Sequence, residues 1–304
     1  MPAACSPAVS RAEASRRAML KFGAHAFCWE GDWTDEIGDR VIEQAARAGL
    51  DFIEIPLLHP ETFDAKRHRR HLEAVGLACV SSLGLPREAH MPHEPQKAVT
   101  FLKGVLDRME ELGARDLTGC TGYSIGVLTG QGPSPQELDR MVDGLAQVAE
   151  DARSRGIGLG LEAINRYETY MVNTLDDALD VVNRVGSDNL RVHADTYHMN
   201  IEEANLREAL QRVEGKLNFI HMSESHRGLV GTGTVPWEQV WQGLADIQFS
   251  GYLTLESFAA PNPELAAATC IWKPPRHTGQ ELAEGGLAFL REGAARHGLM
   301  EQVR

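Results

Sequence analysis

Residues 175–195, LDDALDVVNRVGSDNLRVHAD, contain the pattern that decides the fold. The first half predicts an amphipathic helix, because apolar side chains recur on one face at the helical period: Leu175, Ala178, Leu179, Val182 and Val185. Gly186 then marks the end of the helix, since glycine adopts the left-handed conformation there without a steric penalty. The second half, LRVHAD, has the length of a strand and ends in a carboxylate. The segment therefore predicts a helix that covers a sheet, followed by a strand of that sheet.

The same order of helix, glycine and apolar run recurs between residues 46 and 258, with the glycines spaced as in βα units: Gly49, Gly76, Gly113, Gly156, Gly186, Gly215 and Gly251. The opening run FGAHAFCW, residues 22–29, adds an eighth strand. Strands that alternate with helices pair in parallel through right-handed crossovers. Eight such units predict an α/β fold, a (β/α)8 TIM barrel that forms a single domain over residues 21–304. The alternative is an open doubly wound sheet, but no GxGxxG motif opens a helix.

Three helix starts agree with this division. Ser134, Pro135 and Glu137 form a capping box with proline at the first helical position. Thr174 lies three residues before Asp177, and Pro236 directly precedes another amphipathic segment.

Composition excludes several classes of protein. The 304 residues carry a formal net charge of −13, which argues against nucleic acid as a partner. No run approaches the roughly 20 apolar residues of a membrane-spanning helix, so we expect no membrane association. The five cysteines are scattered and form no CxxC pair, which favours reduced thiols in the cytoplasm. Residues 1–20 lack the apolar core of a secretory signal, and we expect a disordered or variable N-terminal extension.

The last four predicted strands each end in a side chain that can bind a metal ion. Glu162 ends the fifth strand, Asp195 the sixth, His221 the seventh and Glu256 the eighth. In a barrel of this kind the active site lies at the carboxyl ends of the strands, so the four groups can converge at one mouth. Three carboxylates and one imidazole favour one divalent cation, Mn²⁺, Mg²⁺ or Co²⁺, with Zn²⁺ less favoured. The structural alternative is a set of buried salt bridges with Arg166, Arg191 or Arg227.

Further polar and aromatic residues follow the same strand ends and are candidates for binding a small sugar: His25, Trp29, Glu168, His198 and Arg227. A basic stretch at residues 66–71, KRHRRH, is interpreted as a solvent-exposed helix face.

Four segments resemble the ketose 3-epimerases, which belong to the sugar phosphate isomerase/epimerase-like barrels: LEAINRYETYMVNT, HADTYHMNIEEA, HMSESHRGLVGTGTVPW and LTLESF. The resemblance implies a TIM barrel with one divalent ion, commonly Mn²⁺ or Co²⁺, in a homodimer or homotetramer. It implies that Glu162, Asp195, His221 and Glu256 bind the metal, and that Glu168, His198 and Arg227 contact the substrate around O1 to O3. The chain departs from the family at Ser223, where relatives often have glycine, and in the loop TGYSIGVLTGQG.

The expected reaction inverts C3 of a free ketose, such as D-fructose/D-allulose, D-tagatose/D-sorbose or L-ribulose/L-xylulose. It requires a proton-transfer group on each face of a metal-stabilised cis-enediolate, and we assign Glu162 and Glu256 as that pair. Two alternatives use the same metal site: an aldose–ketose isomerase and an inosose-type dehydratase. An apurinic endonuclease shares the barrel but needs a basic groove, and a non-catalytic sugar-binding barrel would not need two opposed carboxylates.

Overall fold

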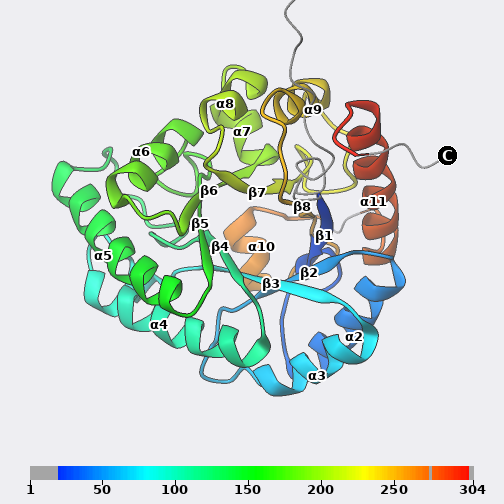
Figure 1. Cartoon of the computed structure of the whole chain (residues 1–304), viewed down its shortest axis with the longest axis horizontal. Helices are drawn as coiled ribbons and strands as arrows, with labels where there is room; N and C mark the ends of the chain where they lie inside the picture. Colours follow the sequence, from blue (N-terminus) through cyan, green and yellow to red (C-terminus); the bar gives the residue numbers. More distant parts are fainter. Residues whose placement is uncertain (1–19, 274–275, 301–304) are drawn as a thin grey trace, which may run out of the picture.

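A closed barrel of eight parallel strands, in the order β1 to β8, forms the centre of the protein (Figure 1). The structure, a computed structural model, describes residues 20–273 and 276–300. It confirms the predicted TIM barrel, while residues 1–19 of the predicted N-terminal extension lie outside the described part. The strands are β1 (Lys21–His25), β2 (Phe52–Pro56), β3 (Ala78–Gly84), β4 (Asp116–Cys120), β5 (Gly158–Glu162), β6 (Leu190–Asp195), β7 (Leu217–Met222) and β8 (Tyr252–Leu255).

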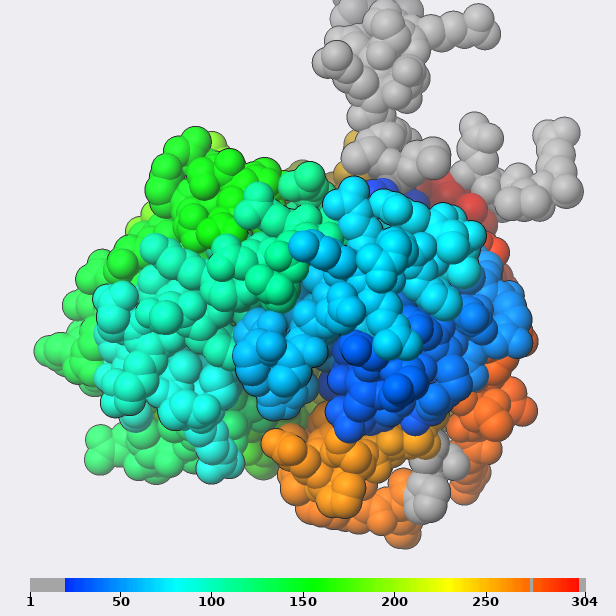
Figure 2. Space-filling view, turned by 90° about the horizontal axis from the view of Figure 1, so that it is seen from below, coloured from blue at the N-terminus to red at the C-terminus, as the bar shows by residue number. Residues whose placement is uncertain are grey.

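Helices surround the barrel as an outer ring (Figure 1). They are α2 (Asp35–Arg47), α3 (Ala65–Val75), α4 (Pro95–Leu112), α5 (Pro135–Ser154), α6 (Leu175–Val185), α8 (Leu206–Arg212), α9 (Trp237–Asp246) and α11 (Gly279–Arg296). Shorter elements follow strand ends: η1 (Ala26–Cys28), η2 (Arg87–Ala89), α7 (Thr196–Glu202) and α10 (Pro263–Thr269). In Figure 1 α10 lies over the centre of the barrel, and in the side view of Figure 2 it lies at one end of the molecule.

The helix starts follow the sequence signals. Ser134 and Glu137 bond reciprocally in a capping box at the start of α5, and Thr174 and Asp177 do so at α6. The helix α9 begins directly after Pro236. Such caps satisfy backbone N–H groups of the first turn that have no partner within the helix.

Six of the seven predicted helix-ending glycines adopt a positive φ, between 67° and 88°. Gly251 does not, and its prediction as a left-handed helix end is wrong. Instead Gln248, the residue directly after the end cap of α9, takes φ 49°. A side chain at Gly251 would collide with the backbone oxygen of Asn218, so glycine is required there for close approach of the chain to β7.

A mainly aromatic layer closes the end of the barrel where the strands begin. Phe52, Val80 and Phe219 are buried inside it, Tyr252 packs against them, and they form a cluster separate from the main core between strands and helices. Ring centroids of Phe52 and Tyr252 lie 5.1 Å apart in an edge-to-face arrangement. This layer fills the end of the barrel where the strands begin, and the polar residues of the interior lie at the other end, where the strands finish.

Two local predictions need correction. The first strand ends at His25 instead of continuing to Trp29, because the His25 ring accepts the backbone N–H of Phe27 and starts the turn η1. Only three residues of the basic stretch 66–71 are exposed, Lys66, Arg69 and Arg70, and His68 is fully buried. Within the described residues, no helix combines the length and apolar character needed to cross a membrane.

Candidate active site

The four predicted strand-end residues meet inside the mouth of the barrel. Glu162 and Asp195 are the last residues of β5 and β6, His221 lies in β7, and Glu256 follows β8. Asp195 and His221 are direct partners in the register between their strands. All four side chains are buried, and between 0% and 9% of each residue is exposed. Burying three carboxylates together is unfavourable unless cations or donors compensate them.

The imidazole of His221 lies at the centre of this cluster. Its Nδ1 is 3.5 Å from an oxygen of Glu162, 3.5 Å from an oxygen of Glu256 and 3.9 Å from Asp195. Although buried, this nitrogen has no hydrogen-bond partner. Among the described residues, no set of metal-competent atoms within 4.8 Å of one another contains both glutamates. Glu162 and Glu256 therefore approach the nitrogen from different directions.

Glu54 contacts the His221 ring at Nε2, the nitrogen that faces away from the other carboxylates. The sequence analysis missed this residue. Its carboxylate lies 3.0 Å from His221 Nε2, which therefore carries the proton and donates it to the acid. This leaves Nδ1 facing the other carboxylates, the usual arrangement behind a metal-binding histidine. Burial opposes charge on this imidazole, but Glu54 and Glu256 outweigh it and raise the pKa of His221 well above its usual value, so a cation that binds Nδ1 would displace a proton. His25 also faces Glu54 at 3.7 Å and contacts Ser82 at 3.0 Å. The available signal was an acidic residue inside the apolar run FIEI.

The site carries more negative charge than its own cations neutralise. Glu54, Glu162, Asp195 and Glu256 surround two cationic groups, the guanidinium of Arg227 and the imidazole of His221, whose pKa is raised well above its usual value. Burial raises the pKa of Asp195 to about 6, and burial likewise raises the pKa of Glu162. Burial lowers the pKa of His25 to about 4, so this imidazole is neutral. The unpaired His221 nitrogen, the surplus of charge and the hard oxygen donors together fit one divalent cation.

Arg227 is buried within the carboxylate cluster. Its guanidinium donates to Asp195 and Ser223 at 2.9 Å each and pairs with Glu256. It also stacks on the ring of Tyr197, 3.8 Å from the centroid. The salt-bridge alternative is thus present for Arg227, whereas Arg166 pairs with Glu202 and Arg191 donates to the backbone of Gly215.

His198 and Glu168 lie beside this cluster. Nδ1 of His198 accepts the backbone N–H of Asn165 at 3.1 Å, and its Nε2 lies 3.1 Å from the guanidinium of Arg227. The carboxylate of Glu168 accepts the side-chain amide of Asn165 at 2.7 Å. Burial raises the pKa of Glu168, and the nearby guanidinium opposes this shift. The structure therefore brings Glu168, His198 and Arg227 into one hydrogen-bonded group beside the four strand-end residues.

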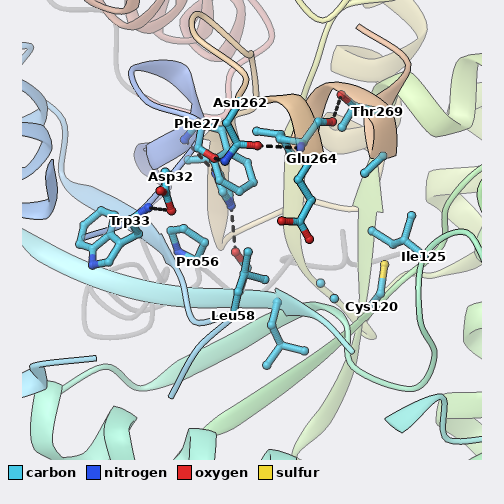
Figure 3. A pocket seen from close by; sticks show the side chains of 18 of the residues that line it. Phe27, Asp32, Trp33, Pro56, Leu58, Cys120, Ile125, Asn262, Glu264 and Thr269 are labelled. Atoms are coloured by element: carbon cyan, nitrogen blue, oxygen red, sulfur yellow. Dashed lines mark hydrogen bonds between the residues drawn. The ribbon is translucent and has the colours of Figure 1, made fainter. Parts of the chain in front are cut away.

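A cavity of about 1420 Å³ opens above the cluster. Its polar floor includes His25, Glu162, Glu168, His221 and Glu256. Figure 3 shows the outer part, with Trp33 and Pro56 on one side, Cys120 and Ile125 on the other, and Glu264 reaching in from α10. The cavity thus joins a charged floor to a more apolar outer part.

The chain is similar to known proteins over most of its length. Residues 42–292 match the xylose isomerase-like TIM barrel family. An L-ribulose 3-epimerase from Methylomonas sp. (strain DH-1) is 33% identical over 279 residues, which cover 90% of this chain and 97% of that protein. The crystal structure of D-allulose 3-epimerase from Methylomonas sp. in complex with D-allulose superposes with a TM-score of 0.87 at 33% identity, covering 90% of this chain and 97% of that one. An L-ribulose 3-epimerase from Mesorhizobium japonicum is 31% identical and covers 90% of this chain and 94% of that protein.

The chain belongs to the ketose 3-epimerase family. Members of this family are isomerases, and this protein is an enzyme of that class.

One residue predicted to bind substrate lies elsewhere in this family member. Trp29 is buried after the turn η1, does not line the cavity and contacts the start of α11 at Gly279. The lining of the cavity gives no support for Trp29 as a substrate contact, and this role stays a prediction. The aromatic residues that do line the cavity are Phe27, Trp33, Phe63, Tyr167 and Tyr197.

The loop that carries Arg227 is organised by Glu224, a second residue that the sequence analysis missed. The fully buried carboxylate of Glu224 accepts the backbone N–H groups of Ser225, Gly231 and Val235 and the indole N–H of Trp237, at 2.8 to 3.2 Å. The backbone oxygen of Glu224 accepts the N–H of Arg227, which adopts a positive φ of 57°. Such a conformation is unfavourable for a non-glycine residue and persists only where the surroundings enforce it.

We expect Glu224→Ala to lower the free energy of unfolding by about 3 kcal/mol, because four donors lose one shared acceptor. Thermal and urea unfolding measure this loss. Glu238→Ala is the matched control, since Glu238 is exposed on α9, and its effect should stay within about 0.5 kcal/mol. Equal losses in the two variants would contradict the organising role of Glu224.

Proposed function

We propose that this protein epimerises free ketoses at C3, with Glu162 and Glu256 as the two proton-transfer groups. One observation carries the proposal: the two carboxylates approach the same His221 nitrogen, each at 3.5 Å, from different directions at the floor of an open cavity. The family relationship supports the reaction type, since its relatives are named ketose, L-ribulose and D-psicose 3-epimerases.

Inversion at C3 needs a base on one face of the sugar and an acid on the other. The first carboxylate removes the C3 proton, which leaves a planar enediolate. The second carboxylate, already protonated, delivers a proton to the opposite face. For the epimeric substrate the two glutamates exchange roles, so each must be able to hold a proton near C3.

The residues fitted to hold a divalent cation are Glu162, Asp195, His221 and Glu256, with Mn²⁺ favoured over Co²⁺ or Mg²⁺. When bound, such a cation supplies Lewis-acid stabilisation of the negative charge that develops on the ketose oxygens. Glu54 keeps the His221 ring oriented for this role. Arg227, His198 and Glu168 orient the substrate near O1 to O3 and contribute donors and acceptors at that end.

The proposal also includes the oligomeric state and the cellular location of the protein. We assign a homodimer or homotetramer in the cytoplasm, and light scattering of the purified protein measures the assembly. The described cysteines are all free thiols, which supports a reducing compartment.

Deuterium labelling tests the reaction. The protein is incubated with Mn²⁺ in deuterated water and with D-fructose, D-tagatose or L-ribulose, and products are analysed by NMR. Formation of the C3 epimer with deuterium at C3 is the expected result for at least one ketose. A metal-free sample, prepared by chelation and restored with Mn²⁺, is the control for metal dependence.

The same experiment separates the alternative reactions. Deuterium at C1 with formation of an aldose would identify an aldose–ketose isomerase. Loss of water with a new ultraviolet chromophore would identify a dehydratase. Either result without C3 epimer would overturn the proposal.

A further inference from the structure

The cavity extends well beyond the carboxylate floor. Its volume of about 1420 Å³ exceeds the roughly 300–1,000 Å³ of pockets that bind drug-sized molecules, and a free ketohexose is smaller than those. The additional space lies over β1 to β4 and under α10, where the lining changes to Trp33, Leu58, Phe63, Leu85, Ile125 and Leu265. The proposed C3 chemistry uses none of these side chains.

Trp33 is held rigidly at this outer wall. Its indole N–H donates to His68 Nε2 at 3.2 Å, and its ring stacks on Phe63 with centroids 6.4 Å apart and planes at 25°. A side chain at Gly38 would lie 2.7 Å from the Trp33 ring and 2.6 Å from the His68 ring, so glycine makes room for this packing. The buried His68 of the basic stretch thus positions an aromatic platform that lines the cavity.

The polar groups around the platform are mostly acidic. Carboxylates of Asp32, Asp35, Glu36, Glu88 and Glu264 line the outer wall, together with the guanidinium of Arg87. Asp35 also pairs with Arg67 at 3.7 Å, which leaves the other four to make the wall acidic. Figure 3 shows Glu264 directed from α10 into the space. Such a rim repels a phosphate ester but accepts hydrogen bonds from hydroxyl groups.

The polar residues at the bottom of the cavity determine how the substrate is oriented. Arg227 and His198 lie on the side of β6 to β8, where the proposed function places O1 and O2 of the ketose. The open space lies on the opposite side, so the C6 end of a ketose held at C3 points toward it. The ring of Phe27 lies 4.2 Å from that of His25, between centroids, and both line the same cavity as Trp33.

We infer that the outer part of the cavity is a second sugar subsite, and that this enzyme also epimerises ketoses that carry an uncharged glycosyl group at C6. The inference rests on the proposed function, because the same glutamates invert C3 of the extended substrate. An aromatic face beside carboxylate acceptors matches the apolar ring face and the hydroxyl edge of a pyranose. A phosphate at C6 is excluded by the acidic rim.

Three substrates test the inference: D-fructose, 6-O-α-D-glucopyranosyl-D-fructose and D-fructose 6-phosphate. The Mn²⁺-loaded full chain is assayed in deuterated water, and deuterium at C3 is measured for each. We expect kcat/KM for the glucosyl compound to lie within about tenfold of the value for fructose, and the phosphate to be at least about a hundredfold poorer. Labelling of fructose without the glucosyl compound would overturn the subsite alone, whereas no labelling of any ketose would overturn the proposed function and the subsite with it.

Two substitutions locate the subsite. The quantity compared is kcat/KM for the glucosyl compound divided by kcat/KM for fructose. Trp33→Ala should lower this ratio at least about tenfold. Trp33→Phe should restore part of the ratio, whereas a folding defect would affect both substrates alike. Glu264→Lys should raise the corresponding ratio for fructose 6-phosphate at least about fivefold. Unchanged ratios in both variants would show that the extended substrate does not use this wall.

Discussion

Glu162→Gln and Glu256→Gln are each expected to lower the rate of C3 epimerisation roughly 10²- to 10⁴-fold, the usual contribution of a general acid or base. Glutamine has nearly the same shape as glutamate but cannot take up a proton from carbon. The two variants should differ in which epimer still exchanges its C3 hydrogen. With one carboxylate left, a proton can leave and return only on the face of that carboxylate, so deuterium enters one epimer with retention of configuration.

The complementary pattern is the decisive measurement. For one ketose pair, Glu162→Gln should label one epimer and Glu256→Gln the other, with both variants assayed at saturating Mn²⁺. Glu202→Gln is the matched control, because Glu202 is a buried glutamate on α7 that pairs with Arg166 outside the cluster. Near-normal epimerisation in either site variant would contradict the two-base assignment, and labelling of the same epimer in both would place the carboxylates on one face.

Much of the fold is readable because each βα unit repeats the same local signals. Glycine at a helix end and a capping residue at the next helix start depend on a few neighbouring residues, and six of the seven glycines behave as expected. Gly251 fails because its role depends on Asn218, which is distant in sequence. Strand ends also locate the metal-competent side chains, since a barrel places the ends of its strands at one mouth.

The supporting residues were harder to predict because their roles arise from contacts between distant segments. Glu54 lies 167 positions from its partner His221, and only the closed barrel brings the two together. Arg227 enters the carboxylate cluster because Glu224 shapes its loop through donors up to 13 positions away. A single turn of 3₁₀ helix follows His25, so Trp29 does not lie in the strand that was expected to contain it. The positions of the strand ends in the sequence identify the candidate metal ligands. The conformations of the loops determine which residues surround those ligands.

Glu54→Gln is expected to weaken the binding of Mn²⁺ about 10- to 100-fold, the usual effect of removing the partner behind a metal-binding histidine. The Glu54 carboxylate keeps the proton on Nε2 of His221 and increases the electron density at Nδ1. Glutamine still accepts a hydrogen bond but lacks the negative charge. The His221 ring therefore becomes less basic while its orientation is kept. Calorimetric titration of the metal-free protein measures the affinity without reference to turnover.

Thermal unfolding gives a second measurement. Stabilisation by a ligand grows with RT ln(1 + [L]/Kd), so each tenfold loss of affinity removes about 1.4 kcal/mol of the stabilisation at fixed Mn²⁺. The matched control is Asp116→Asn. The Asp116 carboxylate accepts the hydroxyl of Tyr252 at 2.8 Å, beside the aromatic layer at the end of the barrel opposite the site. Asp116→Asn should leave the affinity for Mn²⁺ unchanged even where it lowers the stability of the metal-free protein. If Glu54→Gln behaved in the same way, Glu54 would serve only the fold, and the orientation of His221 would have to come from the strand β7 itself.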